Sequence, residues 1–222
     1  RYIMNVEIVS MTKAMGRFKG RTAEDLVSDC ARVSNMKNQG TDSVGLLRYL
    51  IKNKHWSPFE MVNMCVEIET SRAISAQFMR HRSFSFQEFS QRYSEVVEFE
   101  PVQLRKQAET NRQSSTEDLA SDSMAYQGVK YALGAARDIY EDLIERGVSR
   151  ETARMILPMT AKTTFYMNGT LRSWLHFLEV RNHSHAQREA QDIAVQIEKI
   201  MLEHFPTILE SVQNLVGKNE KY

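Results

Sequence analysis

The sequence predicts an α+β fold: a single domain with an antiparallel-rich sheet, several helices and a helical C-terminal half. Three observations favour this fold. The 222 residues lie within the size range of one domain and are enough to bury a core. Residues 61–70 alternate apolar and polar side chains, which is the pattern of a half-buried strand. After residue 124, apolar residues recur mostly at helical spacing.

The first sixty residues predict one strand followed by two helices. Residues 4–11 alternate weakly and are expected to form a strand. Residues 22–35 are expected to be helical, because Thr22 is a suitable N-cap and acidic residues occupy the first turn. A second helix is expected over residues 44–57, ending before Pro58.

Residues 61–70 predict the clearest strand, and a helix and an extended segment follow it. A helix over residues 71–82 would begin at the N-cap Ser71. The aromatic and β-branched residues within 86–100 predict an extended conformation. In the strand, a period of two gathers the apolar side chains on one face. These side chains are Val62, Met64, Val66 and Ile68.

The C-terminal half predicts mainly helices. Residues 103–123 are polar and poor in apolar side chains, so we expect a mobile loop within the domain. Residues 161–170 are rich in β-formers and are expected to break at Asn168–Gly169. Pro158 should stop one of the helices. The expected helices cover residues 124–146, 149–157, 171–182 and 186–204.

Composition excludes several classes of protein. The net charge of +1 gives no molecule-wide field for nucleic acid or membrane. Cys30 and Cys65 lie far apart without CxxC spacing, which argues against a disulfide scaffold and fits a reducing compartment. No apolar run approaches about 18 residues, so we expect a cytoplasmic protein without membrane contact. Met4 is expected to be the natural start, and residues 1–3 an added remnant without function.

The first candidate site lies in the stretch RHRSFSFQEFSQRYSE. Gln77 and Arg80 are three residues apart on the expected helix, so their side chains could meet one ligand. His81 and Arg82 follow directly, and adjacent cationic groups repel one another unless solvated or paired with anions. The alternative is a solvated helix end, where cations favour the helix dipole.

The extended segment adds a second candidate group. A period of two places Glu88, Ser90 and Arg92 on one face. A carboxylate, a hydroxyl and a guanidinium in a line would suit a ligand with ring N–H or sugar O–H groups at one end and a phosphate at the other. The alternative is a polar strand face with an internal Glu–Arg pair.

Further arginines stand in the C-terminal half. Arg150 and Arg154 share a helix face, for which a plain surface helix is the alternative. Arg172 and His176 share another face, whereas Arg181, nine residues past Arg172, points to the opposite side. The His183–Ser–His185 pair lacks a third ligand at useful spacing, so we expect no metal site.

No nucleophile motif, phosphate-binding loop or dinucleotide turn is present in the sequence. Cys65 has no activating neighbour in sequence and is expected to be an inert thiol.

Together these residues resemble the flavin-dependent thymidylate synthase family. The family signature is Arg-His-Arg, seven or eight residues, and then Ser; here Arg80, His81 and Arg82 precede Ser90 by seven residues. The longer form is also present, with Glu88 before this serine and Arg-Tyr-Ser after it. The segments CARVSN, KHWSPFE, ARMILP and FLEVRNHSHAQ agree in order, so the resemblance spans roughly residues 22–192.

The resemblance implies a homotetramer of α+β subunits with active sites shared between chains. The expected reaction is reductive methylation of dUMP to dTMP, with methylenetetrahydrofolate as carbon donor and NADPH as reductant through FAD. A cysteine nucleophile is not needed, because a guanidinium beside the uracil N3–H would favour the deprotonated ring.

The resemblance also implies roles for individual residues. Arg181 corresponds to the catalytic arginine that ionises the uracil ring. The residues expected at the flavin are Ser57, Glu60, Arg80, His81, Arg82, Glu88, Thr170, Arg172, His176 and His185. The residues expected at dUMP are Gln77, Arg80, Glu88, Ser90, Gln91, Arg92, Arg154 and Arg181.

The sequence departs from the family pattern at two positions. Gln91 stands where family members often have glycine, and Thr170 stands where asparagine is common. The main alternative from another class is a non-enzymatic nucleotide or RNA-binding module, whose aromatic and arginine side chains would stack on bases. The absence of a continuous basic stripe disfavours it. A tRNA uracil methyltransferase would bring a dinucleotide fingerprint and a longer chain.

Overall fold

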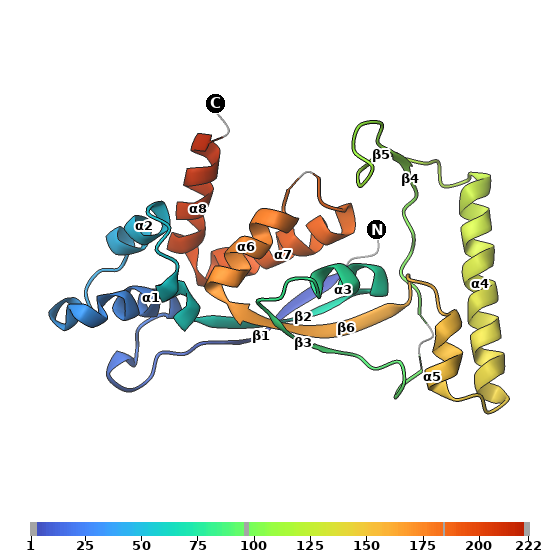
Figure 1. Ribbon diagram of the computed structural model, residues 1–222, viewed down its shortest axis with the longest axis horizontal. Coiled ribbons are helices and arrows are strands. Elements are labelled where there is room, and N and C mark those ends of the chain that lie inside the picture. The colour runs from blue at the N-terminus through green and yellow to red at the C-terminus, as the bar shows by residue number, and fades with distance from the viewer. Residues whose placement is uncertain (1–3, 96–97, 184, 220–222) are drawn as a thin grey trace.

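The computed structural model describes residues 4–95, 98–183 and 185–219. It confirms the predicted α+β class; residues 1–3, the expected remnant, lie outside the described part. At the centre is a four-stranded antiparallel sheet with the strand order β1-β2-β6-β3 (Figure 1). The strands are β1 (Asn5–Met11), β2 (Asn63–Ser71), β6 (Lys162–Thr170) and β3 (Ser85–Glu88).

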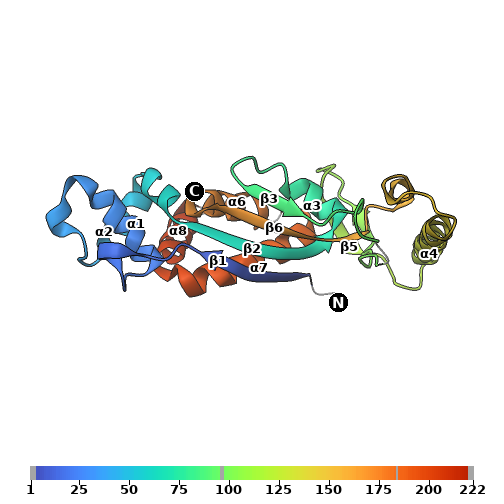
Figure 2. The same cartoon turned by 90° about the horizontal axis from the view of Figure 1, so that it is seen from below.

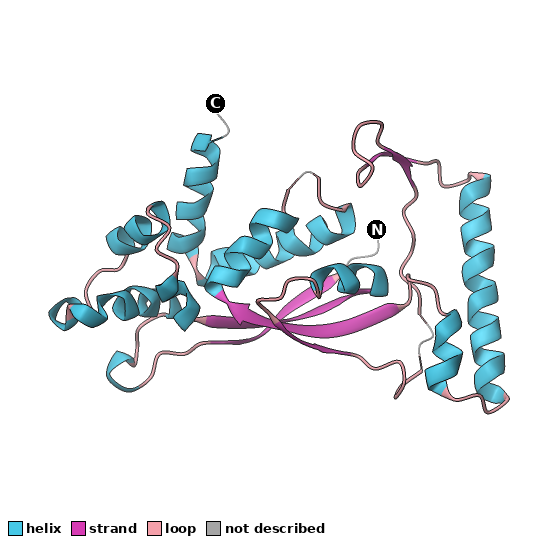
Figure 3. Cartoon of the chain, in the orientation of Figure 1, coloured by secondary structure: helices cyan, strands magenta, loops and turns pink. Residues whose placement is uncertain are grey.

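Helices cover one face of the sheet and extend the molecule at both ends (Figure 3). α3, α6 and α7 lie over the sheet, α1, α2 and α8 gather at one end, and α4 and α5 stand at the other (Figure 1). The helices are α1 (Ala23–Ala31), α2 (Val44–Lys52), α3 (Arg72–Phe78), α4 (Met124–Glu145), α5 (Arg150–Ala153), α6 (Leu171–Arg181), α7 (Arg188–His204) and α8 (Pro206–Asn219).

The core lies between the sheet and its covering helices. The apolar face predicted for β2 is confirmed, because all four of its side chains are buried completely. Trp174 of α6 is also buried, and its indole N–H donates to the Met64 carbonyl at 3.0 Å. On the opposite face, Tyr166 and Asn168 of β6 are exposed, and no helix covers that side in the two views (Figures 1 and 2).

Pairing of β2 with β6 determines where the covering helices meet. The two strands pair in register over nine residues each, a length of about 30 Å. α3 follows one end of this pair and α6 follows the other, and they are about 10 and 16 Å long. Their C-terminal ends therefore approach each other over the sheet. The rings of Phe78 and Phe177 pack edge to face there, with centroids 5.0 Å apart.

Several predicted boundaries were wrong. α2 ends at Lys52, because Lys54 takes a left-handed conformation, and Pro58 instead lies in a short 3₁₀ helix (Ser57–Met61). α3 ends at Phe78 rather than residue 82. The extended segment forms a strand only as far as Glu88, and turns follow.

The break expected at Asn168–Gly169 is also wrong, since β6 continues to Thr170. Glycine is needed here for packing rather than for a turn. A Cβ atom on Gly169 would lie 2.4 Å from Cδ1 of Phe84, whose ring covers the strand.

The polar segment 103–123 contains two short strands, β4 (Arg105–Gln107) and β5 (Ser115–Asp118), which form a hairpin. Two ion pairs tie this hairpin to the first turn of α7. Arg105 pairs with Glu189 at 2.7 Å, and Arg188 pairs with Asp118 at 3.2 Å. The expected mobility of the segment remains a prediction.

We predict that Gly169→Ala lowers the free energy of unfolding by about 1–3 kcal/mol, because the added methyl group displaces the Phe84 ring. Gly134→Ala is the matched control: it lies within α4 with open space around it, and should stabilise by up to about 1 kcal/mol. Urea unfolding measures both. Equal stability of Gly169→Ala and the unsubstituted protein would contradict the packing role.

Candidate active site

The first group of candidate residues gathers where α3 and α6 meet. Arg181, the last residue of α6, extends its guanidinium toward the end of α3. Its Nη2 donates to the carbonyl oxygen of Gln77 at 2.9 Å, and its Nε donates to Nε2 of His81 at 3.0 Å. The guanidinium also stands over the Phe78 ring, 5.7 Å from its centroid. All of these partners are neutral groups.

The electrostatics of this group follow from burial and from like charges. Burial, together with the positive charge of Arg181 and the effect of His176, lowers the pKa of His81 to about 4. The imidazole is therefore neutral at pH 7, with Nε2 as the acceptor and the proton on Nδ1. Burial also lowers the pKa of Arg181, and nearby Arg80 adds to the shift. Arg181 remains charged, because an arginine pKa starts far above 7.

Two more arginines border this group from the turn after α3. Arg80 and Arg82 are exposed, and neither forms an ion pair with an acidic residue in the described part of the chain. Arg80 lies close enough to Arg181 for its charge to lower the pKa of Arg181, and neither pairs with a carboxylate among the described residues. Neighbouring guanidinium groups are favourable only when water or an anionic ligand compensates their repulsion. The solvated helix end considered from sequence does not explain Arg181, which is half-buried.

Glu88 forms a second group, and its setting differs from the one predicted. Arg72 forms a close ion pair with Oε2 of Glu88. The hydroxyls of Ser75 and Thr163 donate to Oε1 at 2.7 and 3.0 Å. The alternative of an internal pair between Glu88 and Arg92 is wrong, because Arg72 is the partner of Glu88. The carboxylate is thereby fixed between α3 and the sheet.

The third group lies beyond β3, near α5. Arg92 is exposed and approaches Glu151 at 3.5 Å. Ser90 is exposed. Gln91 is buried, with only 6% of its surface exposed, and its side-chain Nε2 has no hydrogen-bond partner among the described residues. The single-face alignment of Glu88, Ser90 and Arg92 fails, because the chain turns after Ser90.

Arg154 stands on the α5 side of this third group. Its Nε donates to the backbone carbonyl of Glu151 at 3.4 Å, the residue whose carboxylate approaches Arg92. Arg150 pairs with Glu95 at 2.8 Å, which fits the plain surface-helix alternative for that residue.

A fourth group lies at the start of α6. Arg172 pairs with Glu60 of the short 3₁₀ helix at 2.5 Å, and Ser57 at the start of that helix is exposed. His176 lies one turn along α6 and approaches Glu179 at 3.3 Å. Arg172 and Arg181 have separate partners, and their opposite orientation on one helix stays a prediction.

Two predicted flavin residues have local structural contacts. The Thr170 hydroxyl caps α6 by accepting the Ser173 N–H at 3.2 Å, which explains why threonine serves at this position. His185 is exposed, and its ring lies 4.9 Å from that of His183.

Sequence reasoning missed several residues that complete the groups. Gln187 accepts a hydrogen bond from the Gln77 side chain at 2.6 Å across 110 positions. Arg72, Ser75 and Thr163 fix Glu88. The helical spacing of Arg72 and Ser75 on α3 could have marked those two. The sequence around Gln187 and Thr163 does not indicate their partners, because each hydrogen bond joins segments that are far apart in the chain.

Other chemistry is less well supported by the described residues. Burial raises the pKa of both Cys30 and Cys65, which disfavours a thiolate nucleophile. In the part of the chain that the structure describes, no group of three His, Cys, Asp or Glu side chains could hold a metal ion. None of the described helices is both long and apolar enough to cross a membrane.

The fold and these groups define an α+β protein with Arg181 and Arg80 close together where two helices converge over an antiparallel sheet. Residues 17–207 match the family described as thymidylate synthase complementing protein. The chain belongs to this family.

Curated relatives cover nearly the whole chain. A protein of Paramecium bursaria Chlorella virus 1, named probable flavin-dependent thymidylate synthase, is 41% identical over 94% of this chain and 99% of its own length. The flavin-dependent thymidylate synthase of Synechocystis is 39% identical over 95% of this chain and 100% of its own length. The crystal structure of the UMP/dUMP methylase PolB from Streptomyces cacaoi with 5-Br dUMP has a TM-score of 0.82, 27% identity and 95% coverage of each chain.

We predict that the His81 imidazole titrates with a midpoint near pH 4 and that Arg181→Met raises this midpoint without restoring the ordinary value. Burial, the largest cause of the shift, persists in the variant, whereas the repulsion from Arg181 is lost. NMR titration of the ring proton measures both midpoints. Arg146→Met on α4 is the control; an unchanged midpoint in Arg181→Met would contradict the contact.

Proposed function

We propose that this protein is a flavin-dependent thymidylate synthase that converts dUMP to dTMP without a cysteine nucleophile. The observation that carries the proposal is the Arg181 guanidinium, which is half-buried and, among the described residues, held by the neutral partners Gln77 and His81. A charged group in this setting favours an anionic ligand. A uracil ring that loses its N3 proton provides that anion, and its C5 becomes more nucleophilic.

The positions of the side chains support specific roles at the nucleotide. Gln77 and His81 hold Arg181 in one orientation, so the guanidinium needs little reorganisation when negative charge develops on the ring. Because His81 is neutral, it adds no competing positive charge at the Arg181 Nε. Arg92 and Arg154, both near Glu151, are proposed to bind the dUMP phosphate together with Ser90. The buried, unpaired Nε2 of Gln91 offers a further donor.

The residues present suit FAD, whose diphosphate requires cationic partners. Arg80 and Arg82 are exposed and free of acidic partners among the described residues, and Arg172 and His176 are also accessible. We propose that these side chains hold the flavin with Ser57, Glu60, Glu88, Thr170 and His185. When bound, FAD supplies the hydride chemistry, which no protein side chain can supply. The chain's own residues bind, orient and polarise.

The nucleotide residues support a site shared between copies. Gln77 and Arg181 lie where α3 and α6 meet, whereas Arg92 and Arg154 lie near α5. No hydrogen bond or ion pair among the described residues joins these two sets. Two copies that each supply one set would complete a site.

Exposed apolar side chains at the α4–α5 end support an interface with further copies. α4 buries only Tyr140 of its own side chains, while Met124 and Tyr131 are 91% and 81% exposed. Met155, beside Arg154, is 80% exposed. We propose the homotetramer expected from the resemblance as the assembly that covers these groups.

The co-substrates belong to the same proposal. We infer NADPH as reductant and methylenetetrahydrofolate as carbon donor from the family to which the chain belongs. A cytoplasmic location follows from the proposed reaction, because dUMP and NADPH are charged and do not cross membranes unaided.

The test begins with the absorbance spectrum of the protein after addition of FAD. We expect a bound-flavin spectrum that bleaches on anaerobic addition of NADPH, faster with dUMP present, and dTMP when methylenetetrahydrofolate is added. Arg181→Met should retain the flavin spectrum but lose about 100-fold or more in turnover, as when one preorganised donor is removed from a charge-stabilising site.

Arg146→Met, in an exposed ion pair on α4, is the control and should be fully active. Absence of flavin uptake would refute the proposed synthase function. It would favour the alternative in which the arginines belong to a non-enzymatic nucleotide or RNA-binding module. Full activity of Arg181→Met would leave the synthase intact but refute its role in ring ionisation.

A further inference from the structure

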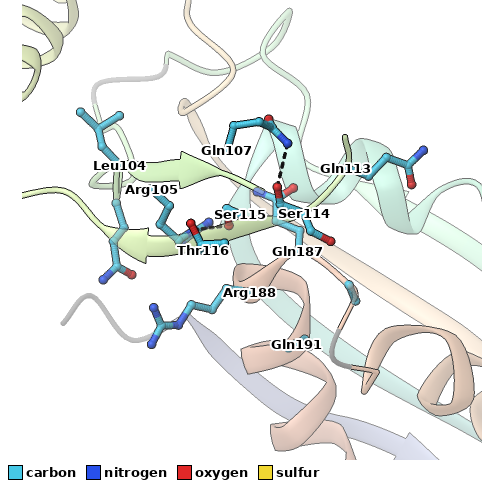
Figure 4. A pocket seen from close by; sticks show the side chains of 12 residues that line it. Leu104, Arg105, Gln107, Gln113, Ser114, Ser115, Thr116, Gln187, Arg188 and Gln191 are labelled. Carbon is cyan, nitrogen blue, oxygen red and sulfur yellow. Dashed lines mark hydrogen bonds between the residues drawn. The ribbon is translucent and has the colours of Figure 1, made fainter. Parts of the chain in front are cut away.

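An open cavity of about 570 Å³ lies between the β4–β5 hairpin and the first turn of α7 (Figure 4). None of the flavin or dUMP residues predicted from the sequence lines this cavity. The residues that line it on the hairpin side are Gln103, Leu104, Arg105, Gln107 and Gln113 to Thr116, and those on the other side are Ala186, Gln187, Arg188 and Gln191. The volume is sufficient for part of a small-molecule ligand.

Arg105 is the best-anchored charged residue of this cavity. Its side chain is only 9% exposed. Nη2 donates to both carboxylate oxygens of Glu189, at 2.7 and 2.8 Å, and Nε donates to the Ser115 hydroxyl at 2.9 Å. The third nitrogen, Nη1, is buried without a hydrogen-bond partner. An unsatisfied buried donor of a charged group is costly, so this atom calls for an acceptor.

The rest of the wall favours an oxyanion. Among the described residues that line the cavity there is no carboxylate, and Arg188, which also approaches Asp118 beside the cavity at 3.2 Å, adds a second guanidinium. Arg188 begins α7, a helix of 17 residues with no side-chain cap at Gln187, so its first N–H groups and its dipole attract negative charge. The neutral donors are the amides of Gln113 and Gln187 and the hydroxyls of Ser114 and Ser115, whereas the amides of Gln103, Gln107 and Gln191 and the Thr116 hydroxyl already donate within the protein.

The cavity adjoins the proposed nucleotide site through one hydrogen bond. Gln187 lines the cavity and accepts from the Gln77 side chain at 2.6 Å. Gln77 in turn receives Arg181 through its backbone carbonyl. A ligand that reaches the reacting atoms near Arg181 could therefore extend its far end past Gln187 into the cavity.

We propose that this cavity binds an oxyanion at the far end of a co-substrate: a glutamyl carboxylate of the folate or a phosphate of NADPH. The inference rests on the proposed function, which makes these two molecules the co-substrates. Both carry their negative charge far from the reacting atoms. Arg105 Nη1, Arg188 and the start of α7 would receive the oxyanion, and the side chains of Gln113, Gln187, Ser114 and Ser115 would donate to its remaining oxygens.

The main test removes the buried charge without leaving a carboxylate unpaired. The double variant Arg105→Met with Glu189→Gln does so, and Arg146→Met with Asp142→Asn removes a remote ion pair as the matched control. Flavin reduction is compared with NADPH and NADH, and dTMP formation with folates bearing one and three glutamyl groups. We expect the cavity variant to lose about tenfold or more in apparent affinity for one of these ligand types, and the control to lose none.

A second pair of variants keeps the test valid should the hairpin fail to fold without Arg105. Thr116 is exposed on the cavity wall, so Thr116→Glu adds negative charge there and Thr116→Gln adds none. Thr116→Glu should lower the affinity for the same ligand about tenfold, and Thr116→Gln should leave that affinity unchanged. Calorimetry with adenosine 2′,5′-bisphosphate and with the folyl triglutamate gives binding constants independent of turnover.

The outcomes distinguish NADPH from the folate as the source of the oxyanion, and they distinguish failure of the cavity inference from failure of the proposed function. Selective loss with NADPH and the bisphosphate assigns the cavity to the nicotinamide nucleotide; selective loss with the triglutamate assigns it to the folate. Unchanged affinity for both in Thr116→Glu overturns the inference. If the unsubstituted protein takes up no flavin, the proposed function fails, and the calorimetric comparison still decides whether the cavity binds an oxyanion.

Discussion

The antiparallel pairing of β2 with β6 is the constraint on which the rest of the structure depends. It fixes two segments about 100 residues apart in register over nine residues each. Because each strand leads directly into a helix, the two helices start at opposite ends of the pair and converge over the same face. The site thus forms at the place where α3 and α6 end. Without this register, Arg181 could not reach the carbonyl of Gln77.

The convergence of α3 and α6 also creates the electrostatic property of the site. Phe78 and Phe177 pack between the helix ends and exclude water from one side of Arg181 and His81. In that setting the imidazole stays neutral and the guanidinium stays charged. The two side chains thus differ in charge although they share a hydrogen bond. A charged donor held by neutral groups is suited to an anion that appears only during reaction.

Much of the fold could be predicted from the sequence, because it depends on local pattern. The period of two in β2 and the long helical spacing after residue 124 led to the correct elements. The errors arose where distant contacts overrule local preference. Gly169 looked like a strand break, yet it lies within β6 because the Phe84 ring needs its space. The hairpin in segment 103–123 is fastened by Glu189, far along the chain.

The candidate site shows the same division. The Arg-His-Arg motif and Arg181 could be found because their spacing is distinctive, and the structure brings Arg181 and His81 into contact. The neighbours that give them their chemistry could not be found, since Gln187 and Thr163 are joined to their partners only by the fold. Nor could the sequence reveal that Glu88 pairs with Arg72 rather than Arg92. Spacing identifies candidates, and topology decides their partners.

We propose that one chain supplies separate halves of two different active sites. Subunit complementation tests this proposal most directly, with Arg181→Met and Arg92→Glu chains carrying different tags and co-expressed. Each variant alone should form little dTMP at limiting dUMP. In mixed assemblies, the Arg181 half of one chain meets the Arg92 half of the other, so activity should return. Mixed assemblies that stay as inactive as either parent would contradict the shared site and place both halves within a single chain.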